Sequence, residues 1–277
     1  METDKIVCLN DCYMPAGEAA VPVADQGLLY GMGIFETIRV SGGLPRLVGL
    51  HLSRLQKSAG ELGLEVPYSP GAIEEMLYRT AQKNGITEGG LRLTLTAGGG
   101  QCRPSLLVQP RDQTYGEEMY SLGIRAGFSP YVRNERSPLV RHKTLNYYEN
   151  IMARRLAASS GWGEALFLNC SGNLAEGSVS NVFLVRDGRV ITPESGSGLL
   201  PGITRRRVID ACASLKIPLE ERVVGPGRLY GAGEIFLTNS LMGVMPLTRL
   251  ENTPVGNGVP GEITRLVAQE MERLAAL

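Results

Sequence analysis

The alternation of strand-like and helix-like stretches along the whole chain most constrains what this sequence can fold into. Residues Gly33–Val40 alternate apolar and polar side chains, which is typical of a half-buried strand. From His51 to Leu62 the apolar side chains recur every three or four residues, which predicts an amphipathic helix. No repeat of 20 to 50 residues accompanies this pattern, so it indicates a mixed α+β fold rather than a solenoid.

Similar patterns elsewhere extend the prediction to both halves of the chain. Further strands are expected at Ile6–Leu9, Leu91–Thr96, Ser105–Gln109, Ile124–Phe128, Ala165–Leu168, Val182–Val185 and Arg189–Ile191. Further helices are expected at Ala72–Lys83, Tyr147–Ser159, Thr204–Leu215 and Ile263–Leu274. The stretch Pro110–Ser121 is polar and rich in turn formers, and we interpret it as a linker. It divides the chain into two expected domains, residues 1–118 and 119–277.

Composition narrows the class of protein. The chain has 277 residues, of which 43% are hydrophobic, enough for a well-buried core. Lys plus Arg equals Asp plus Glu at 28 each, so no overall field attracts nucleic acid or an anionic membrane. The chain has no apolar run of membrane-spanning length and a polar beginning, which favours the cytoplasm. The five cysteines are scattered, which indicates reduced thiols and no zinc site, and no metal is expected.

Lys143 is the first candidate for chemistry. It lies in the short polar stretch Arg141-His142-Lys143, between a predicted strand and a predicted helix. A lone lysine is usually a solvated surface charge and becomes reactive only when burial or cationic neighbours change its proton affinity. Arg141 and His142 are such neighbours. Whether Lys143 is a surface charge or a reactive lysine therefore depends on the rest of the sequence.

Glu176 is the second candidate. It ends one predicted strand and precedes a turn of small residues and the apolar strand at Val182. A carboxylate in such a turn is ordinarily solvated. A cofactor with a pyridine ring, however, needs an anion beside its ring nitrogen, because the protonated ring is the better electron sink.

Three further segments offer donors to an anion. Leu200-Pro201-Gly202-Ile203-Thr204-Arg205 opens a helix, where free backbone N–H groups and the Thr204 hydroxyl suit a phosphate. Arg54 supplies a guanidinium fork. Thr238-Asn239-Ser240 follows an apolar run and adds hydroxyl and amide donors. Each has an ordinary structural explanation when taken alone.

The order of these segments resembles the class IV aminotransferase family, the fold-type IV pyridoxal 5′-phosphate enzymes, over nearly the whole chain. The matching segments are Gly31-x-Gly33-x-Phe35-Glu36-Thr37-Ile38-Arg39, His51-Leu52-x-Arg54-Leu55, Lys143-x-x-Asn146-Tyr147, Glu176-Gly177-x-x-Ser180-Asn181-Val182-Phe183, Leu200-x-Gly202-Ile203-Thr204-Arg205 and Phe236-x-Thr238-Asn239-Ser240.

The resemblance implies a fold, a cofactor and a set of roles. It implies two α/β domains with pyridoxal 5′-phosphate in the cleft between them, Lys143 in the second domain, and a homodimer. Lys143 is then the Schiff-base lysine and Glu176 the partner of the ring nitrogen. The resemblance also implies that Tyr147 reaches the phenolic oxygen of the ring, and it assigns the phosphate to Arg54, Ile203, Thr204 and Ser240.

Members of this family are transaminases or 4-amino-4-deoxychorismate lyases, which release pyruvate and 4-aminobenzoate for folate synthesis. The segment Asn239-Ser240-Leu241-Met242-Gly243 resembles the lyase form. D-Amino-acid transaminases carry an Arg-x-His pair after the strand that contains Arg92, where this chain has Ala97 and Gly99. The resemblance therefore favours the lyase, with a branched-chain or D-amino-acid transaminase as the alternative.

Glu36, Arg92 and Asn239 are candidates for the substrate side of the site. Glu36 is shared with transaminases, whereas some lyases carry threonine there. It is either a substrate contact or a residue of the strand. A third class of function, a protein that binds anions without catalysis, is disfavoured because holding a phosphate requires neither Lys143 nor Glu176.

Overall fold

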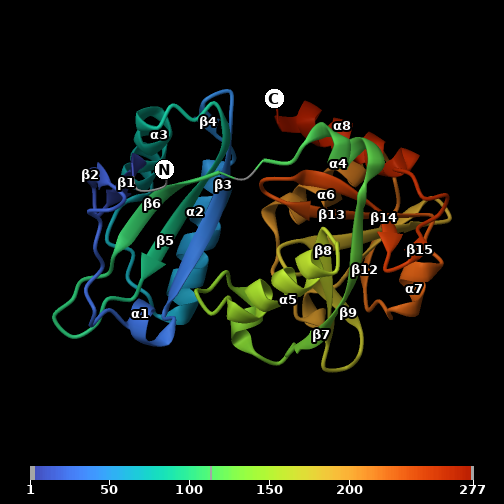
Figure 1. Ribbon diagram of the computed structural model, residues 1–277, viewed down its shortest axis with the longest axis horizontal. Helices are drawn as coiled ribbons and strands as arrows, with labels where there is room; N and C mark the ends of the chain where they lie inside the picture. The colour runs from blue at the N-terminus through green and yellow to red at the C-terminus, as the bar shows by residue number, and fades with distance from the viewer. Residues whose placement is uncertain (1–3, 113, 276–277) are drawn as a thin grey trace. The chain divides into compact units, whose positions relative to one another are not determined.

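The computed structural model describes residues 4–112 and 114–275, which form two compact units (Figure 1). The first comprises the described residues up to Thr114 together with His142–Asn146. The second comprises Tyr115–Arg141 and the described residues from Tyr147 onward. Both combine helices with one large sheet, which confirms the mixed fold that the alternating patterns predict.

The first unit contains a six-stranded sheet in the order β2-β1-β6-β5-β3-β4, in which the described pairs are antiparallel. Its elements are β1 (Ile6–Leu9), β2 (Cys12–Pro15), α1 (Gln26–Tyr30), β3 (Gly33–Ser41), β4 (Leu44–Pro45), α2 (Val48–Leu62), α3 (Pro70–Lys83), β5 (Glu88–Thr96) and β6 (Leu106–Arg111).

One face of this sheet forms the core of the first unit. Alternate side chains such as Ile38 of β3 and Leu93 of β5 are fully buried against Leu55 of α2 and Leu77 of α3. Because side chains alternate along a strand, the residues between them point to the opposite face. That opposite face carries Phe35 and Arg92.

The second unit contains a nine-stranded sheet in the order β12-β11-β10-β13-β14-β7-β8-β9, with β15 paired to β14. Its strands are β7 (Ile124–Arg133), β8 (Glu164–Asn169), β9 (Leu174–Gly177), β10 (Asn181–Arg186), β11 (Arg189–Pro193), β12 (Leu219–Arg222), β13 (Glu234–Asn239), β14 (Gly243–Leu250) and β15 (Thr253–Pro254). Its helices are α4 (Glu117–Leu122), η2 (Pro138–Arg141), α5 (Tyr148–Ser159), η3 (Ser195–Ser197), α6 (Ile203–Ser214), α7 (Gly227–Tyr230) and α8 (Glu262–Ala275).

Separate apolar clusters hold the helices of the second unit to its sheet. Phe183 of β10 and Phe236 of β13 stack at 4.9 Å between ring centres and pack with Val208 of α6 and Val267 of α8. Phe167 of β8 packs with small residues of α5. These contacts attach α5 and α6 to the sheet, and segments singled out in the sequence lie at the starts of both helices.

The division of the chain differs from the expected one at 118/119. The connection between β6 and α4 is shorter than the predicted linker Pro110–Ser121, because β6 continues to Arg111 and α4 begins at Glu117. The segment His142–Asn146, expected in the second domain, belongs to the first unit.

Backbone hydrogen bonds to β3 explain where the Lys143 segment lies. The Phe35 N–H donates to the Lys143 carbonyl at 2.8 Å, and the Leu145 N–H donates to the Gly33 carbonyl at 2.9 Å. Gly33 leaves room for this approach, since a Cβ there would lie 2.6 Å from Leu145 Cδ1. The lysine is therefore fixed to the first sheet through its own main chain.

No helix of the described residues is both long and apolar enough to cross a membrane.

Candidate active site

Lys143 and Arg92 share one aromatic ring in the first unit. The Lys143 amine lies 4.4 Å from the centre of the Phe35 ring, and the Arg92 guanidinium carbon lies 3.7 Å from it. Arg92 Nε also donates to Thr94 Oγ1 at 3.2 Å. Aromatic faces attract cations, so Phe35 holds both groups at the face of the sheet opposite α2 and α3. The structure thus brings together two of the residues predicted from the sequence.

Glu36 and Arg54 are also brought together, on the helix-covered face of the same sheet. Arg54 Nε donates to Glu36 Oε1 at 2.8 Å, and Arg54 Nη2 donates to Oε2 at 2.6 Å. His51, one turn earlier on α2, lies with Nδ1 2.6 Å from Oε2. Glu36 is only 1% exposed. Both carboxylate oxygens are engaged inside the unit, which favours the interpretation of Glu36 as a residue of the strand.

The charge of Glu36 is maintained despite its burial. Burial alone raises the pKa of this carboxyl group, but the Arg54 charge and the hydrogen bonds from His51 and Arg54 lower it to about 2. The ion pair occupies one edge of the Arg54 guanidinium, a group with five N–H donors. Glu36 therefore orients Arg54.

Glu176 is the next-to-last residue of β9, and both of its carboxylate oxygens accept hydrogen bonds. Arg133 Nη2 donates to Oε1 at 3.0 Å, and the Leu200 N–H donates to Oε2 at 3.0 Å. Arg133 also donates to Glu149 at 3.1 Å and lies over the Phe167 ring at 4.6 Å. Arg133 is thus the cationic partner of the Glu176 carboxylate, the kind of group required beside a pyridinium.

The turn that follows Glu176 is built around a second buried carboxylate, Glu164. This group is 2% exposed, and the serine turn Gly177–Ser180 wraps around it. Its donors are Ser178 N–H at 3.1 Å, Val179 N–H at 3.3 Å, Ser180 Oγ at 2.7 Å, Ala165 N–H at 2.9 Å, and Ser178 Oγ. Sequence reasoning did not identify Glu164. The available signal was a carboxylate immediately before the apolar run Ala165–Leu168.

Two of the predicted site residues bind the main chain of this serine turn. The Tyr147 hydroxyl donates to the Ser178 carbonyl at 3.3 Å, beside Asn150 Nδ2 at 2.7 Å. Asn239 Nδ2 donates to the Val179 carbonyl at 3.2 Å. Glu176, Tyr147 and Asn239 therefore meet at one loop of the second unit, although they lie far apart in the sequence.

Asn239 also shapes the turn between β13 and β14. Its Oδ1 accepts from the N–H groups of Leu241 and Met242, both at 2.9 Å. The neighbouring Ser240, predicted to bind phosphate, is half-buried at the same turn.

The predicted anion cradle begins α6. Gly202 is the N-cap of this twelve-residue helix and offers no side-chain cap to the first N–H groups, while Ile203 and Thr204 are buried. A Cβ on Gly202 would lie 2.1 Å from Asn181 Oδ1, so the loop passes close to β10. The buried Thr238 hydroxyl has no hydrogen-bond partner among the described residues. An uncapped helix start and an unsatisfied hydroxyl suit a phosphate.

Within the described residues, no group of three or more His, Cys, Asp or Glu side chains is arranged to hold a metal ion. The five cysteines are free thiols.

Comparison with known proteins identifies the family. The sequence model of amino-transferase class IV matches residues 33–250. A D-alanine aminotransferase from Bacillus licheniformis is 28% identical over 274 residues, covering 96% of this chain and 95% of the relative. An aminodeoxychorismate lyase from Bacillus subtilis is 30% identical over 267 residues, covering 91% and 89%.

A solved structure shares the fold. The T.th. branched-chain amino acid aminotransferase with pyridoxamine 5′-phosphate superimposes with a TM-score of 0.91 at 27% identity, covering 99% of this chain and 95% of that one. The chain belongs to the class IV aminotransferase family. It is a pyridoxal 5′-phosphate-dependent enzyme with the two-domain fold-type IV architecture.

The residues present fit this cofactor. The phosphate of the cofactor requires an anion cradle. Its protonated ring nitrogen requires a carboxylate, and its aldehyde requires an amine. The uncapped start of α6 with the unsatisfied Thr238 hydroxyl, the Arg133-bound carboxylate of Glu176, and the Lys143 amine supply these groups.

Proposed function

We propose that this enzyme is a 4-amino-4-deoxychorismate lyase that releases pyruvate and 4-aminobenzoate for folate synthesis. The observation that carries the proposal is the turn after β13, where Asn239 binds the N–H groups of Leu241 and Met242 and the Val179 carbonyl. This segment has the lyase-like sequence. The aminodeoxychorismate lyase of Bacillus subtilis among the relatives supports the same activity.

A second observation argues against D-amino-acid transamination. Ala97 and Gly99 occupy the positions of the Arg-x-His pair, and Gly99 has a φ of +136°. A Cβ on Gly99 would lie 2.7 Å from Gln26 Cγ. Histidine at this position would therefore require the loop to rearrange.

The roles of the residues follow from their chemistry. When bound, pyridoxal 5′-phosphate supplies an electron sink for the carbon that bears the substrate nitrogen. Glu176, which is paired with Arg133, would supply the carboxylate at the ring nitrogen. Arg54, oriented by Glu36, and the start of α6 with Ile203, Thr204 and Ser240 hold the phosphate. Tyr147, whose hydroxyl group lies at the serine turn, would contact the phenolic oxygen of the ring.

Lys143 moves the protons. Its amine accepts the proton from the substrate carbon that bears nitrogen, and the electron pair left behind forms part of the aromatic ring of the product as the C–O bond to the enolpyruvyl group breaks. Lys143 then donates a proton to the departing enolpyruvate, which becomes pyruvate. The two products together contain all the atoms of the substrate, and no amino group is transferred, so no keto-acid acceptor is consumed.

The decisive experiment supplies 4-amino-4-deoxychorismate alone and follows both products. Sustained release of pyruvate and 4-aminobenzoate in a one-to-one ratio, without any keto acid, is the expected result. Fast transamination of leucine or D-alanine with 2-oxoglutarate, together with no pyruvate from aminodeoxychorismate, contradicts the proposal and favours the transaminase.

The transaminase is the second candidate, because Glu36 is shared with transaminases and relatives of similar identity are named as such. In that case Lys143 and Glu176 keep their roles, and the proton returns to the cofactor instead of the leaving group.

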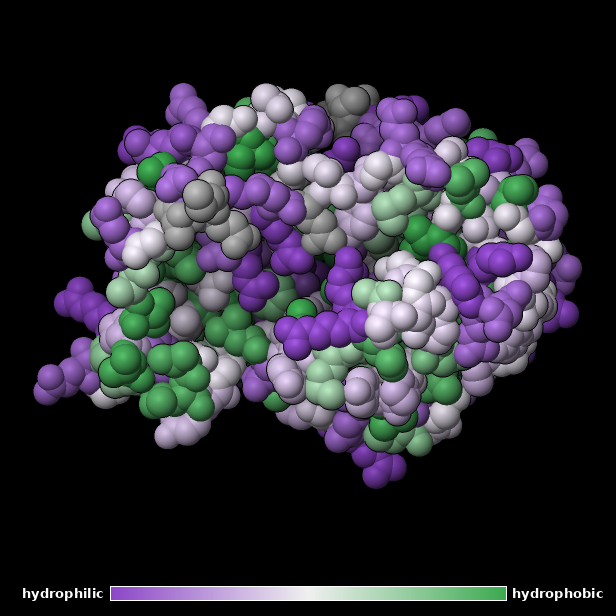
Figure 2. All heavy atoms as spheres, in the orientation of Figure 1, coloured by the Kyte–Doolittle hydropathy of each residue, from purple (hydrophilic) through white to green (hydrophobic). Residues whose placement is uncertain are grey.

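We further propose that the enzyme is a cytoplasmic homodimer. An apolar surface around α1 supports the dimer: Val23, Leu28, Leu29, Tyr30 and Met32 are between 43% and 81% exposed. In Figure 2 this surface is the green region at the lower left. Exposed apolar patches of this kind commonly mark interfaces, and a second copy of the chain would cover it. Sedimentation of wild type and Leu28→Ser tests the dimer, and a monomeric wild type contradicts it.

A further inference from the structure

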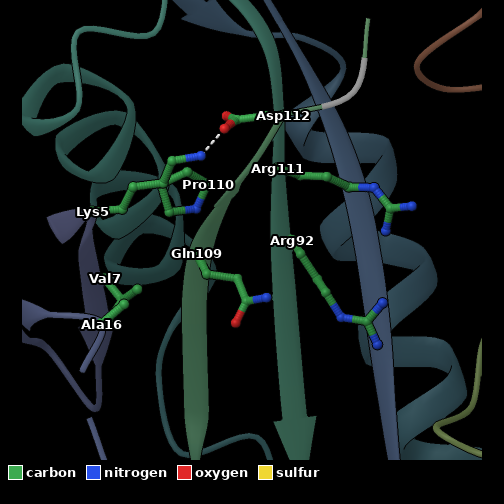
Figure 3. Close-up of a pocket in the computed structure, with 8 residues that line it drawn as sticks. All are labelled: Lys5, Val7, Ala16, Arg92, Gln109, Pro110, Arg111 and Asp112. Atoms are coloured by element: carbon green, nitrogen blue, oxygen red, sulfur yellow. Dashed lines mark hydrogen bonds and ion pairs between the residues drawn. The ribbon is translucent and has the colours of Figure 1, made fainter. Parts of the chain in front are cut away.

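A basic pocket opens on the first sheet, on the face that carries Phe35 (Figure 3). Its volume is about 410 Å³. The residues that line it come from the chain before β1, from β1, β5 and β6, and from the residues just after β2 and β6: Lys5, Val7, Ala16, Arg92, Gln109, Pro110, Arg111 and Asp112.

Strand register explains why two arginines line the pocket. In the β5–β6 pair, Arg92 is opposite Gln109 and Gly90 is opposite Arg111. Arg92 and Arg111 are therefore diagonal neighbours on the same face, a separation that long side chains can bridge. Figure 3 shows both arginine side chains extending in the same direction from the two strands, with the Gln109 amide between the two strands.

The charge of the pocket favours an anion. Three basic groups line it, Lys5, Arg92 and Arg111, against the single carboxylate of Asp112, which pairs with Lys5 and is 73% exposed. Guanidinium groups bind carboxylates through two parallel hydrogen bonds, and Gln109 adds an amide donor.

Phe35 connects this pocket to the reactive amine. Arg92 belongs to the pocket and lies over the Phe35 ring, whose centre is 4.4 Å from the Lys143 amine. Arg92 and Lys143 therefore contact the same ring. In 4-amino-4-deoxychorismate the amine and the ring carboxylate belong to one six-membered ring, so this substrate needs a carboxylate site near the site of its amine.

We propose that this pocket binds the ring carboxylate of the substrate, with Arg111 and Arg92 as its cationic partners and Gln109 as a neutral donor. The inference rests on the lyase function proposed above. It identifies Arg111, which the sequence did not single out, as a residue that determines specificity. Because the product 4-aminobenzoate keeps this carboxylate, the pocket also binds the product.

The test compares two probes of one shape, 4-aminobenzoate and the neutral 4-aminobenzamide, by titration calorimetry on cofactor-loaded protein. Wild type should bind the carboxylate about tenfold more tightly, with a preference that shrinks as salt rises. Arg111→Met should abolish most of the preference, and Arg111→Lys should restore part of it. Arg79→Met, a matched change at an exposed pair with Glu75 on α3, should leave it unchanged.

A fourth variant should strengthen the binding of 4-aminobenzoate, where Arg111→Met weakens it. Asp112→Asn removes the carboxylate that competes for Lys5, so it should tighten 4-aminobenzoate binding and leave 4-aminobenzamide unaffected. Equal affinities of wild type for the two probes, or equal weakening of both probes by Arg111→Met, would overturn the proposal.

The outcome can be separated from that of the lyase proposal. A charge-dependent preference in a protein that releases no pyruvate from aminodeoxychorismate overturns the lyase and leaves the carboxylate pocket. Active lyase with equal probe affinities overturns only the pocket.

Discussion

Glu36 and Arg54 form a two-point ion pair inside the first unit, with donor–acceptor distances of 2.8 and 2.6 Å. The Glu36 carboxylate fixes the plane of the Arg54 guanidinium, and His51 supports it from the same helix. The phosphate affinity assigned to Arg54 then depends on a residue that need not touch the cofactor.

We therefore expect Glu36→Gln to weaken cofactor binding in the same direction as Arg54→Ala. The neutral amide keeps the shape but leaves the arginine charge uncompensated, a change that costs about 3 kcal/mol of stability in buried pairs. The measurement is the cofactor dissociation constant, with Glu75→Gln at an exposed helix pair as the matched control. Wild-type cofactor affinity in Glu36→Gln would show that Arg54 needs no such support.

The same carboxylate predicts a pH dependence of stability. The Arg54 and His51 interactions hold the pKa of Glu36 at about 2, below its ordinary value of 4.5. A lowered pKa stabilises the fold above the ordinary value, and this contribution is lost as the pH falls toward 2. The difference in unfolding free energy between wild type and Glu36→Gln should be constant above about pH 5 and shrink between 4.5 and 2. Urea denaturation across this range measures it, and a constant difference would contradict the ion-pair explanation.

Lys143→Ala should abolish turnover and remove the visible absorbance of cofactor attached to lysine. We assign the amine over Phe35 as the nucleophile, and alanine cannot replace it. Borohydride reduction of the wild type followed by peptide mapping should place the cofactor on Lys143. Attachment at Lys57, Lys83 or Lys216 would refute the assignment.

Glu176→Gln should leave cofactor affinity largely intact and lower the rate by orders of magnitude, about 10² or more. A neutral amide keeps one oxygen, which can accept from either Arg133 or Leu200 but not from both, and it cannot balance a ring cation. Saturating cofactor and single-turnover rates separate binding from chemistry. If the variant loses cofactor and regains the normal rate when saturated, the carboxylate serves binding instead.

Gly177→Ala should destabilise the serine turn. A Cβ at this position would lie 2.2 Å from Ser180 Oγ and 3.0 Å from the Glu164 carboxylate. The turn would have to release Glu164, leaving a buried charge with fewer donors, at a cost of about 1–3 kcal/mol. Thermal unfolding and cofactor affinity should both fall, whereas Gly188→Ala, in an open hairpin turn with a positive φ, should lower only the unfolding temperature.

The elements that could be predicted from the sequence are those with a strong local period. The strand Ile6–Leu9 has the bounds expected, and the helix expected at Ala72–Lys83 begins only two residues earlier, at Pro70. Residues that act through distant partners carried no such signal. Arg133 reaches Glu176 across 43 residues and Glu164 holds a turn 14 residues away, and neither separation follows a helical or strand repeat. The Lys143 segment was expected in the second domain but groups with the first unit, because its backbone bonds to Gly33 and Phe35 produce no periodic pattern of side chains in the sequence.

The attachment of His142–Asn146 to β3 also bears on how such enzymes can diversify. The first unit is discontinuous in the chain, since its reactive segment is encoded after the start of the second. Recombination that exchanged only the residues before Thr114 would transfer the sheet, Phe35 and the basic pocket but leave the nucleophile behind. Such an exchange would also transfer Arg54, to which we assign the phosphate, so the proposed substrate pocket would be inherited with part of the cofactor site and without Lys143. The proposed pocket and Lys143 thus contact the same Phe35 ring but are encoded in separate stretches of the chain.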